Sequence, residues 1–242
     1  MSWTAVKDAV NNNPKLKAIL PVGSIEQHGP HLPLSTDSLI AEYIATRVAN
    51  LLTFMLCPTL TIGYSLEHAG FPGTVTFTMQ TYSSIIKEIA ESLFDGGFKT
   101  LIIINGHGGN RAILDSSITS IKHTHPDLNL LSFTVLDIAR VKFGETRRSP
   151  WKFIGHADEL ETSMMLAIHP NLVEMSKVVI EEPGFPSGIS LETEDLTKVT
   201  YGWRTKDVTR SGIIGDPSFA SPELGRLLLD HVVETISSTI GE

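Results

Sequence analysis

Histidine and carboxylate side chains gather in two segments that each follow an apolar run of strand length. Glu26, His28 and Asp37 come after residues 18–22, and the glycine-rich segment 105–110, which contains a further histidine, comes after a second run. Ligands of open α/β sheets bind beyond the carboxyl ends of the strands, so both segments are expected at one site. Histidine nitrogens and carboxylate oxygens together suit Zn, Mn or Fe and require no cysteine. The two segments therefore predict a transition-metal site.

Each segment also has a plainer interpretation. Asp37 stands where a helix is expected to begin, and aspartate is a common N-cap residue. The segment 105–110, Asn-Gly-His-Gly-Gly-Asn, has the glycines of a loop that binds a phosphate at a helix N-terminus. It lacks the Lys-Ser/Thr of a P-loop and the G-x-G-x-x-G spacing of dinucleotide-binding proteins, which argues against a nucleotide. A non-catalytic metabolite- or nucleotide-binding loop thus remains the alternative to a metal site.

The chain that carries these segments alternates between short apolar runs and longer amphipathic stretches. This alternation is typical of βα units and predicts an α/β fold with a mostly parallel sheet. Strands are predicted at residues 18–22, 53–56, 74–77, 100–105 and 130–135. Helices are predicted from Thr36 or Asp37 to about residue 52, at 83–95, at 112–123, after Asp158, and from 222 to about 236.

Composition restricts the compartment and the partners. The 242 residues are 41% hydrophobic, which is enough for a buried core in a single domain over 1–242. A formal net charge of -8 without a dense basic run argues against nucleic acid and anionic membranes as partners. One cysteine, Cys57, excludes an intramolecular disulfide framework and a thiolate-rich zinc site. The sequence shows neither a secretory signal nor an apolar stretch of membrane length, so we expect a cytoplasmic protein.

The segment 181–217 differs in composition from the rest of the chain. It is rich in Gly, Pro, Ser and Thr and has neither the helical nor the strand period. Long irregular segments are uncommon in compact domains and are often functional. We expect this one to be a loop or insertion that covers the site or contacts a neighbouring subunit.

Four segments of the chain resemble the creatininase family, in the order in which the family has them. They are 23–37 (Gly-Ser-Ile-Glu-Gln-His-Gly-Pro-His-Leu-Pro-Leu-Ser-Thr-Asp), 71–74 (Phe-Pro-Gly-Thr), 105–110, and 156–166 (His-Ala-Asp-Glu-Leu-Glu-Thr-Ser-Met-Met-Leu). Together they extend over about residues 16–170. The resemblance implies a creatininase-like fold, a three-layer αβα sandwich around a mostly parallel sheet. It also implies a homo-oligomer, since the family tends to form hexamers.

The resemblance implies two divalent metal ions, Zn, Fe or Mn, as cofactors. Glu26 would bind one ion, His28 the other, Asp37 would bridge the two, and His107 would complete the ligands of the first. Creatininase itself reads Asn-Gly-His-Tyr-Glu-Asn at the glycine-rich loop, and its glutamate supplies a further carboxylate. This chain has Gly109 there, which leaves one carboxylate ligand to be found elsewhere.

The segment 156–166 offers two glutamates for that place. If Asp158 is a helix N-cap, Glu161 at the third helical position has an alternative role in a capping box. Glu159 lies three residues after His156 and can turn the same way. We therefore expect Glu159 to be the ligand and Glu161 to lie behind it or at the helix cap. On this expectation, Glu159→Gln lowers the occupancy of one metal more than Glu161→Gln does.

His156 resembles the acid/base histidine of the family. A histidine suits a group that passes a proton to a leaving nitrogen, because its unperturbed pKa lies near neutral pH. With a metal-activated hydroxide as nucleophile, the resemblance predicts hydrolysis of a non-peptide C–N bond in a cyclic amide or formamide. The glycine-rich loop is closer to the formamidopyrimidine deformylase-like members than to creatininase proper. Creatinine is therefore not the preferred substrate.

The small-molecule substrate is expected to meet residues beside the four segments. Ser65 resembles part of a pocket loop of the family, and His68 and Gly108 flank the predicted ligands. Arg111 directly follows the glycine-rich loop and is a candidate for binding a phosphorylated substrate. Its plainer interpretation is a surface residue in the first turn of a helix.

Overall fold

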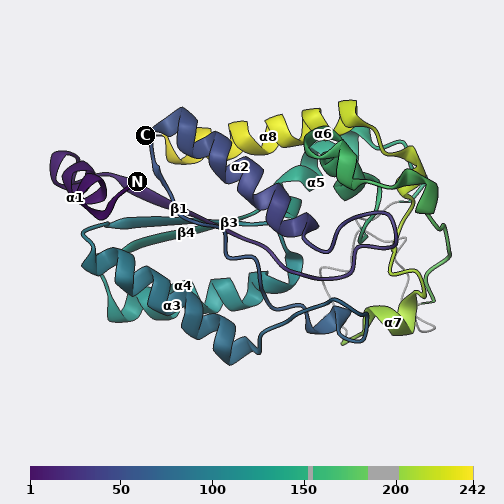
Figure 1. The fold of residues 1–242 in the computed structure, drawn as a ribbon, viewed down its shortest axis with the longest axis horizontal. Coiled ribbons are helices and arrows are strands. Elements are labelled where there is room, and N and C mark those ends of the chain that lie inside the picture. The colour runs from purple at the N-terminus through teal and green to yellow at the C-terminus, as the bar shows by residue number, and fades with distance from the viewer. Residues whose placement is uncertain (152–154, 185–201, 242) are drawn as a thin grey trace.

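The computed structural model describes residues 1–151, 155–184 and 202–241 and is built on a parallel sheet (Figure 1). Four strands, β1 (Lys17–Val22), β2 (Met55–Leu56), β3 (Thr100–Asn105) and β4 (Asn129–Thr134), lie in the order β2-β1-β3-β4. All three pairings are parallel, so the carboxyl ends of the strands meet at one edge. The structure thereby confirms the predicted α/β fold with a parallel sheet.

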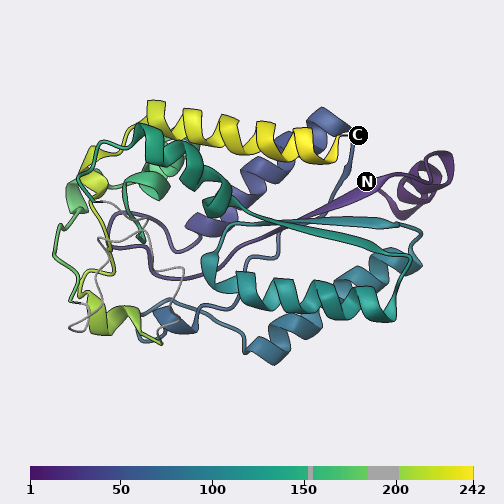
Figure 2. The same ribbon diagram turned by 180° about the vertical axis from the view of Figure 1, so that it is seen from behind.

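Helices cover both faces of the sheet (Figures 1 and 2). One face carries α2 (Thr36–Leu52), α5 (Val135–Thr146), α6 (Glu159–Ile168) and α8 (Pro222–Ile240), and the other carries α3 (Met79–Asp95) and α4 (Arg111–Thr124). The remaining helices of the described residues are α1 (Trp3–Asn12), α7 (Thr205–Val208) and short 3-10 turns, η1 (Leu66–His68), η2 (Gly108–Asn110), η3 (Pro170–Leu172), η4 (Met175–Lys177) and η6 (Pro217–Phe219). In the described part of the chain, no helix has the length and apolar character needed to cross a membrane.

Alternate residues of the central strands pack on opposite faces. In β3, Ile102 and Ile104 belong to the hydrophobic cluster on the α8 side, whereas Leu101 and Ile103 belong to the cluster on the α3 and α4 side. All four side chains are essentially inaccessible to solvent. Successive side chains of a strand point to opposite faces, and a parallel sheet covered by helices on both faces needs apolar residues at every position. This explains why the strands are continuous apolar runs in the sequence.

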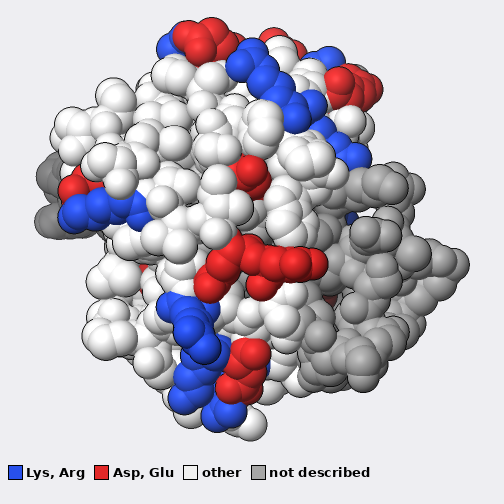
Figure 3. Space-filling view, turned by 90° about the vertical axis from the view of Figure 1, so that its right-hand side faces the viewer, with Lys and Arg blue, Asp and Glu red and all other residues white. Residues whose placement is uncertain are grey.

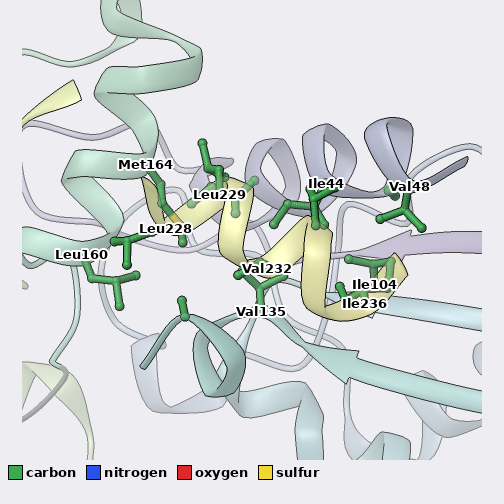
Figure 4. Packing of buried hydrophobic residues seen from close by; sticks show 14 of the residues in the cluster. Ile44, Val48, Ile104, Val135, Leu160, Met164, Leu228, Leu229, Val232 and Ile236 are labelled. Carbon is green, nitrogen blue, oxygen red and sulfur yellow. The ribbon is translucent and has the colours of Figure 1, made fainter. Parts of the chain in front are cut away.

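The α8 helix closes one of these two hydrophobic clusters. Figure 4 shows Leu228, Val232 and Ile236 along one side of α8, with Leu228 beside Leu160 and Met164 of α6 and Ile236 beside Ile104 of β3. Their spacing of four residues places them on one helix face. Ser221 begins the helix by accepting a hydrogen bond from the Leu224 backbone nitrogen. The apolar pattern was recognised in the sequence, but the helix continues four residues beyond its predicted end, to Ile240.

One predicted strand is wrong, and the helices begin and end at other residues than expected. Residues 74–77 form no strand; only Val75 pairs, with Ile25, as an isolated antiparallel bridge. The reason is that the chain turns at Gly73, whose φ is 91, and then enters α3 at Met79, four residues before the predicted start. Two further helices, α1 and α5, were not predicted from the sequence.

The chain order of the strands creates a crevice between β1 and β3. The connection that follows β1 passes over one face of the sheet through α2, whereas the connection that follows β3 passes over the other face through α4. Such a switch point leaves a crevice beyond the carboxyl ends of the two strands. At Gly106, a Cβ atom would lie 2.2 Å from the Asp37 carbonyl oxygen. Glycine thus allows the end of β3 to approach the first turn of α2.

The packing of α8 predicts a contrast between two neighbouring leucines. Leu228 is fully buried, whereas Leu227 is 42% exposed. Removing buried methyl groups costs transfer free energy and leaves a cavity, so Leu228→Ala should lower the free energy of unfolding by about 2–5 kcal/mol. Leu227→Ala should change it by less than about 0.5 kcal/mol. Urea unfolding curves measure both, and equal effects would contradict the assigned orientation of α8.

Candidate metal centre

Buried histidines and carboxylates meet in the crevice at the carboxyl ends of β1 and β3. Their atoms form three overlapping groups, in each of which the potential ligand atoms lie within 4.8 Å of one another. The groups are Glu26, Asp37 and His107; His28, Asp37 and Glu161; and Glu26, His28 and His156. The first two share Asp37. The structure thus brings together four of the five predicted metal ligands.

Asp37 lies at the centre of this cluster, in the first turn of α2. Its Oδ1 is 3.1 Å from His28 Nε2, and its Oδ2 is 3.0 Å from His107 Nδ1. Ser24 donates a hydrogen bond from Oγ to Oδ2 at 2.6 Å, which fixes the carboxylate. One carboxylate therefore faces two histidines with different oxygens, as a bridging group between two ligand sets must.

Glu26 belongs to the same cluster from the loop that follows β1. Its Oε2 is 3.2 Å from His107 Nδ1. Its Oε1 is 3.3 Å from His68 Nε2 and 3.9 Å from His156 Nδ1. Three imidazole rings thus surround one carboxylate.

The chemistry of the cluster fits bound cations. Glu26, Asp37 and Glu161 are each at most 3% exposed, and no lysine or arginine of the described residues forms an ion pair with them. Glu26 Oε2 is buried without a hydrogen-bond partner within the described ranges. Buried carboxylates are costly unless they are paired or coordinate a metal. Carboxylates with imidazoles form the donor set that zinc, manganese and iron accept.

The pKa shifts within the cluster also indicate a site that favours bound positive charge. Burial disfavours a charge on His28 and His107, but the neighbouring carboxylates outweigh burial and raise the pKa of both imidazoles. Burial would raise the pKa of Asp37, but His28 and His107 hold it well below its usual value. The carboxylates of this cluster therefore attract positive charge, and an entering cation has to displace protons from the imidazoles.

The two glutamates of α6 lie in different surroundings. Glu161 Oε1 lies 3.8 Å from His28 Nε2, inside the cluster. Both oxygens of Glu159 instead accept hydrogen bonds, at 2.9 Å each, from the backbone nitrogens of Arg148 and Ser149. Glu159 belongs to none of the ligand groups found among the described residues. This geometry therefore favours Glu161 over the expected Glu159 as the source of the missing carboxylate.

A tight turn before α6 explains this outcome. Ala157 has a φ of 51, in the left-handed region, and Asp158 caps α6 by accepting from the backbone nitrogens of Leu160 and Glu161. Glu161 Oε2 accepts from the Ala157 backbone nitrogen at 2.6 Å, while its Oε1 faces the cluster. Sequence reasoning treated a structural role and a ligand role as exclusive. A carboxylate has two oxygens, so one oxygen of Glu161 can hold the turn while the other remains available to a ligand group.

His156 is fixed on both its backbone and its side chain. Its backbone exchanges two hydrogen bonds of 2.9 Å with Ile214, and its Nε2 donates to the Gln27 carbonyl at 2.6 Å. Burial and the neighbouring His28 lower the pKa of His156. The neutral imidazole with its proton on Nε2 has a free lone pair on Nδ1, the nitrogen nearest Glu26. His156 thus presents a proton acceptor to the cluster.

A cavity of about 1130 Å³ opens onto the metal-ligand cluster. The lining residues named by the sequence or the cluster are Glu26, His68, His107, Gly108, Gly109, His156 and Glu161. Gly202, Trp203 and Arg204 also line it, so part of the segment 181–217 borders the site, as predicted; residues 185–201 of that segment lie outside the described residues. Figure 3 faces this end of the molecule, where acidic and basic side chains lie side by side and neither sign covers the visible surface.

Two predicted substrate-binding residues do not line this cavity in the part of the chain that is described. Arg111 Nη1 forms an ion pair with Asp137 Oδ2 at 2.8 Å at the surface, as its plainer interpretation suggested. Ser65 is fully buried. Sequence reasoning also missed a residue that does line the cavity, Glu67, although it directly precedes His68.

The glycine-rich loop uses its asparagines to hold its own shape. Asn110 accepts a hydrogen bond from the Tyr64 backbone nitrogen and donates to the Gly23 carbonyl. Asn105 Oδ1 accepts from the His107 backbone nitrogen. These bonds fasten the loop to the segment that follows β1 and to Tyr64, just before η1, and they orient His107. They favour a ligand-positioning role for the loop over a phosphate-binding one.

The fold and this cluster define an α/β protein with a candidate dinuclear metal centre at the carboxyl edge of its sheet. The chain belongs to the creatininase family, because the family model for creatinine amidohydrolase matches residues 1–240.

Known proteins of several activities are similar to this chain. A creatinine amidohydrolase from Pseudomonas putida is 28% identical and covers 93% of this chain and 88% of its own length. A 3-dehydro-scyllo-inosose hydrolase from Thermotoga maritima is 30% identical, covering 90% of this chain and 76% of itself. A formylamino-ribosylaminopyrimidine monophosphate deformylase from Methanococcus maripaludis is 36% identical in sequence. The aligned region covers only 40% of this chain and 43% of the deformylase. A solved mutant creatininase of zinc–zinc type aligns with a TM-score of 0.85 and 25% identity, over 99% of this chain and 95% of that structure.

The positions of the two glutamates predict that only one of them affects the metal content. Glu161→Gln should lower the bound metal, because it removes a carboxylate charge from the group around His28. Glu159→Gln should leave the metal content unchanged, because both oxygens of Glu159 accept hydrogen bonds from the backbone nitrogens of Arg148 and Ser149, away from the ligand groups. Elemental analysis of the two purified variants, which differ only in position, decides between them. Loss of metal in Glu159→Gln alone would refute this assignment.

The raised pKa of the imidazoles predicts that metal binding releases protons. A cation competes with the protons that the carboxylates favour on His28 and His107, so the apparent metal affinity should fall as pH falls. Calorimetric titration of Zn²⁺ into the metal-depleted protein, in two buffers with different ionisation enthalpies, counts the protons released. An affinity independent of pH between about 5 and 8 would speak against these residues as ligands.

Proposed function

We propose that this protein is a metal-dependent hydrolase of a non-peptide C–N bond in a small cyclic amide or formamide. One observation carries the proposal: two ligand groups share Asp37 and stand beside a buried, neutral His156 in one cavity. Membership of the creatininase family supports it. A hydrolase needs an activated water, a polarised carbonyl and a proton carrier, and this arrangement has a candidate for each.

Two divalent ions would be held by the chain's own residues in the following way. Glu26 and His107 would hold one ion, His28 and Glu161 the other, and Asp37 both. Zinc, iron and manganese suit these donors, and the zinc–zinc form of the similar creatininase mutant supports the pair. Such ions would lower the pKa of water and polarise the carbonyl of the substrate.

His156 would move the proton. Its Nδ1 is free to take a proton as water attacks the carbonyl carbon, while its Nε2 keeps its hydrogen bond to the Gln27 carbonyl. The resulting imidazolium faces Glu26, whose carboxylate stabilises the charge. The proton then passes from Nδ1 to the leaving nitrogen as the C–N bond breaks. Burial and the lowered pKa of His156 make it a ready proton donor at neutral pH.

The size and lining of the cavity support a small molecule as substrate. A volume of about 1130 Å³ is at the upper end of ordinary ligand sites, which span roughly 300–1,000 Å³. Among the substrates considered, a formamide of the deformylase type remains our proposal over creatinine, because the chain has Gly109 where creatininase has a glutamate. The local similarity to a deformylase supports it.

A binding protein without catalysis, using the loop 105–110, is the alternative function. No contact of the described residues favours it, since the asparagines of that loop already form hydrogen bonds with the protein's own backbone. The two functions differ in one respect that is easily measured. A nucleotide- or metabolite-binding loop would keep its ligand after metal removal, whereas the hydrolase would lose its activity.

The domain organisation and location expected from composition, and the assembly expected from the family resemblance, are proposals here. We propose that residues 1–242 form one domain, that the protein acts in the cytoplasm, and that it assembles as a homohexamer. Light scattering on the purified protein tests the assembly directly. A monomer of 26.4 kDa would exclude it.

Metal removal and a substrate screen test the proposed reaction. The purified protein is screened against cyclic amides and formamides for release of amine or formate. Activity found in this way should vanish after exhaustive chelation and return with Zn²⁺, Mn²⁺ or Fe²⁺. Activity that survives complete removal of metal would refute the proposed function.

The role of His156 predicts a separation between metal binding and turnover. Loss of a general acid–base group typically costs 10²–10⁴-fold in rate, so His156→Gln should lower kcat by about that factor. Metal content should stay near that of the unaltered protein, because the other ligands remain. Kinetics on the substrate found in the screen, with elemental analysis of the same sample, measures both. Loss of metal in His156→Gln would identify His156 as a ligand instead.

A further inference from the structure

Two consecutive residues of η1, Glu67 and His68, contact proposed ligands of the first ion. His68 Nε2 lies 3.3 Å from Glu26 Oε1, and Glu67 Oε1 lies 3.4 Å from His107 Nε2. The contact of Glu67 was not anticipated from the sequence. One turn of 3-10 helix therefore stands behind both Glu26 and His107.

The two nitrogens of His107 face different partners. Nδ1 lies 3.2 Å from Glu26 Oε2 and 3.0 Å from Asp37 Oδ2, within the ligand group. Nε2 lies 2.9 Å from the Tyr64 carbonyl oxygen and 3.4 Å from Glu67 Oε1, on the other side of the ring. With two acceptors beside it, Nε2 keeps its proton, so Nδ1 is the nitrogen that would bind an ion once its own proton is displaced. Glu67 thus lies behind the ligand and not among the atoms that would bind the ion.

The Tyr64 carbonyl and the Glu67 carboxylate have complementary effects. The carbonyl is the nearer acceptor and sets the direction of the ring, whereas the carboxylate adds a negative charge. A carboxylate behind a metal-binding imidazole raises its basicity and strengthens the metal bond. The Glu67 side chain is 20% exposed, and no lysine or arginine in the described ranges forms an ion pair with it. Its charge is therefore available to His107.

Gly109 provides the room that Glu67 occupies. A Cβ atom at residue 109 would lie 2.4 Å from Glu67 Oε1, 2.4 Å from His107 Nε2 and 2.8 Å from the Tyr64 oxygen. Any side chain there would push the carboxylate or the imidazole aside. The glycine that removes one carboxylate from the loop 105–110 thus admits another, from η1.

His68 holds Glu26 in a similar way. Gln27 donates from Nε2 to His68 Nδ1 at 2.9 Å, so the proton of the neutral His68 ring sits on Nε2 and is directed at Glu26 Oε1. Thr205 Oγ1, in α7, lies 3.1 Å from the same Nδ1. The position of η1 is thereby fixed between the loop after β1 and α7.

We propose that Glu67 is a positioning residue of the metal centre, which raises the metal affinity of His107 from behind the ring and requires glycine at residue 109. The proposal rests on the metal centre described above. It assigns to Glu67 a contribution to binding and no direct contact with the ion.

Metal affinity tests this role without an assay of turnover. Glu67→Gln keeps the shape of the side chain and removes its charge; competition with a chromophoric chelator should show Zn²⁺ binding weakened by about ten- to a hundredfold. The visible spectrum of bound Co²⁺ should shift, because the basicity of a ligand changes. Glu88→Gln, on the exposed side of α3, is the matched control and should leave both unchanged.

A second variant protects the test against misfolding. Gly109→Ala keeps the charge of Glu67 but displaces it from His107, and should also weaken Zn²⁺ binding. Circular dichroism of the metal-depleted proteins checks that each variant is folded. If the unaltered protein binds Zn²⁺ and a folded variant binds it equally well, the role of Glu67 is wrong and the metal centre stands. If the unaltered protein binds no Zn²⁺, both are wrong.

Discussion

Three buried carboxylates set the central constraint on this molecule. Glu26, Asp37 and Glu161 converge at the edge of the sheet, and the described residues provide only imidazoles, and neither lysine nor arginine, to balance their charge. Like charges in a medium of low polarity repel strongly, so such a group persists only with cations or protons in it. The pKa values of the neighbouring histidines, raised at His28 and His107, reflect the same demand.

The fold meets this constraint through its strand order. Because β1 and β3 are neighbours while their following helices lie on opposite faces, the loops after both strands open into one crevice. Three of the proposed ligands are held by contacts that are not themselves catalytic: Ser24 holds Asp37, the Ala157 backbone nitrogen holds Glu161, and Asn105 holds the backbone of His107. Pre-organisation of this kind is what a metal site needs to select its ions and their geometry.

The sequence predicted the parts of this structure that depend on local pattern. Apolar runs identified β1 and β3, and the positions of Glu26, His28, Asp37 and His107 directly after them located the site. What failed depended on contacts between distant segments. The choice between Glu159 and Glu161 turned on the left-handed Ala157 and on two backbone nitrogens at 148–149. The strand expected at 74–77 is reduced to one bridge between Val75 and Ile25, because the chain turns at Gly73 and enters α3 at Met79.

Glu67 was missed for the same reason, because it lies some 40 residues from His107 in the chain and no local pattern marks the two as neighbours.

The central claim, that two ions share Asp37, is tested most directly by anomalous X-ray diffraction from crystals of the metal-loaded protein, recorded at the absorption edge of the metal. The account predicts two anomalous peaks, one among Glu26, Asp37 and His107 and the other among His28, Asp37 and Glu161. A single peak remote from Asp37, or none in a protein shown to be active, would contradict it.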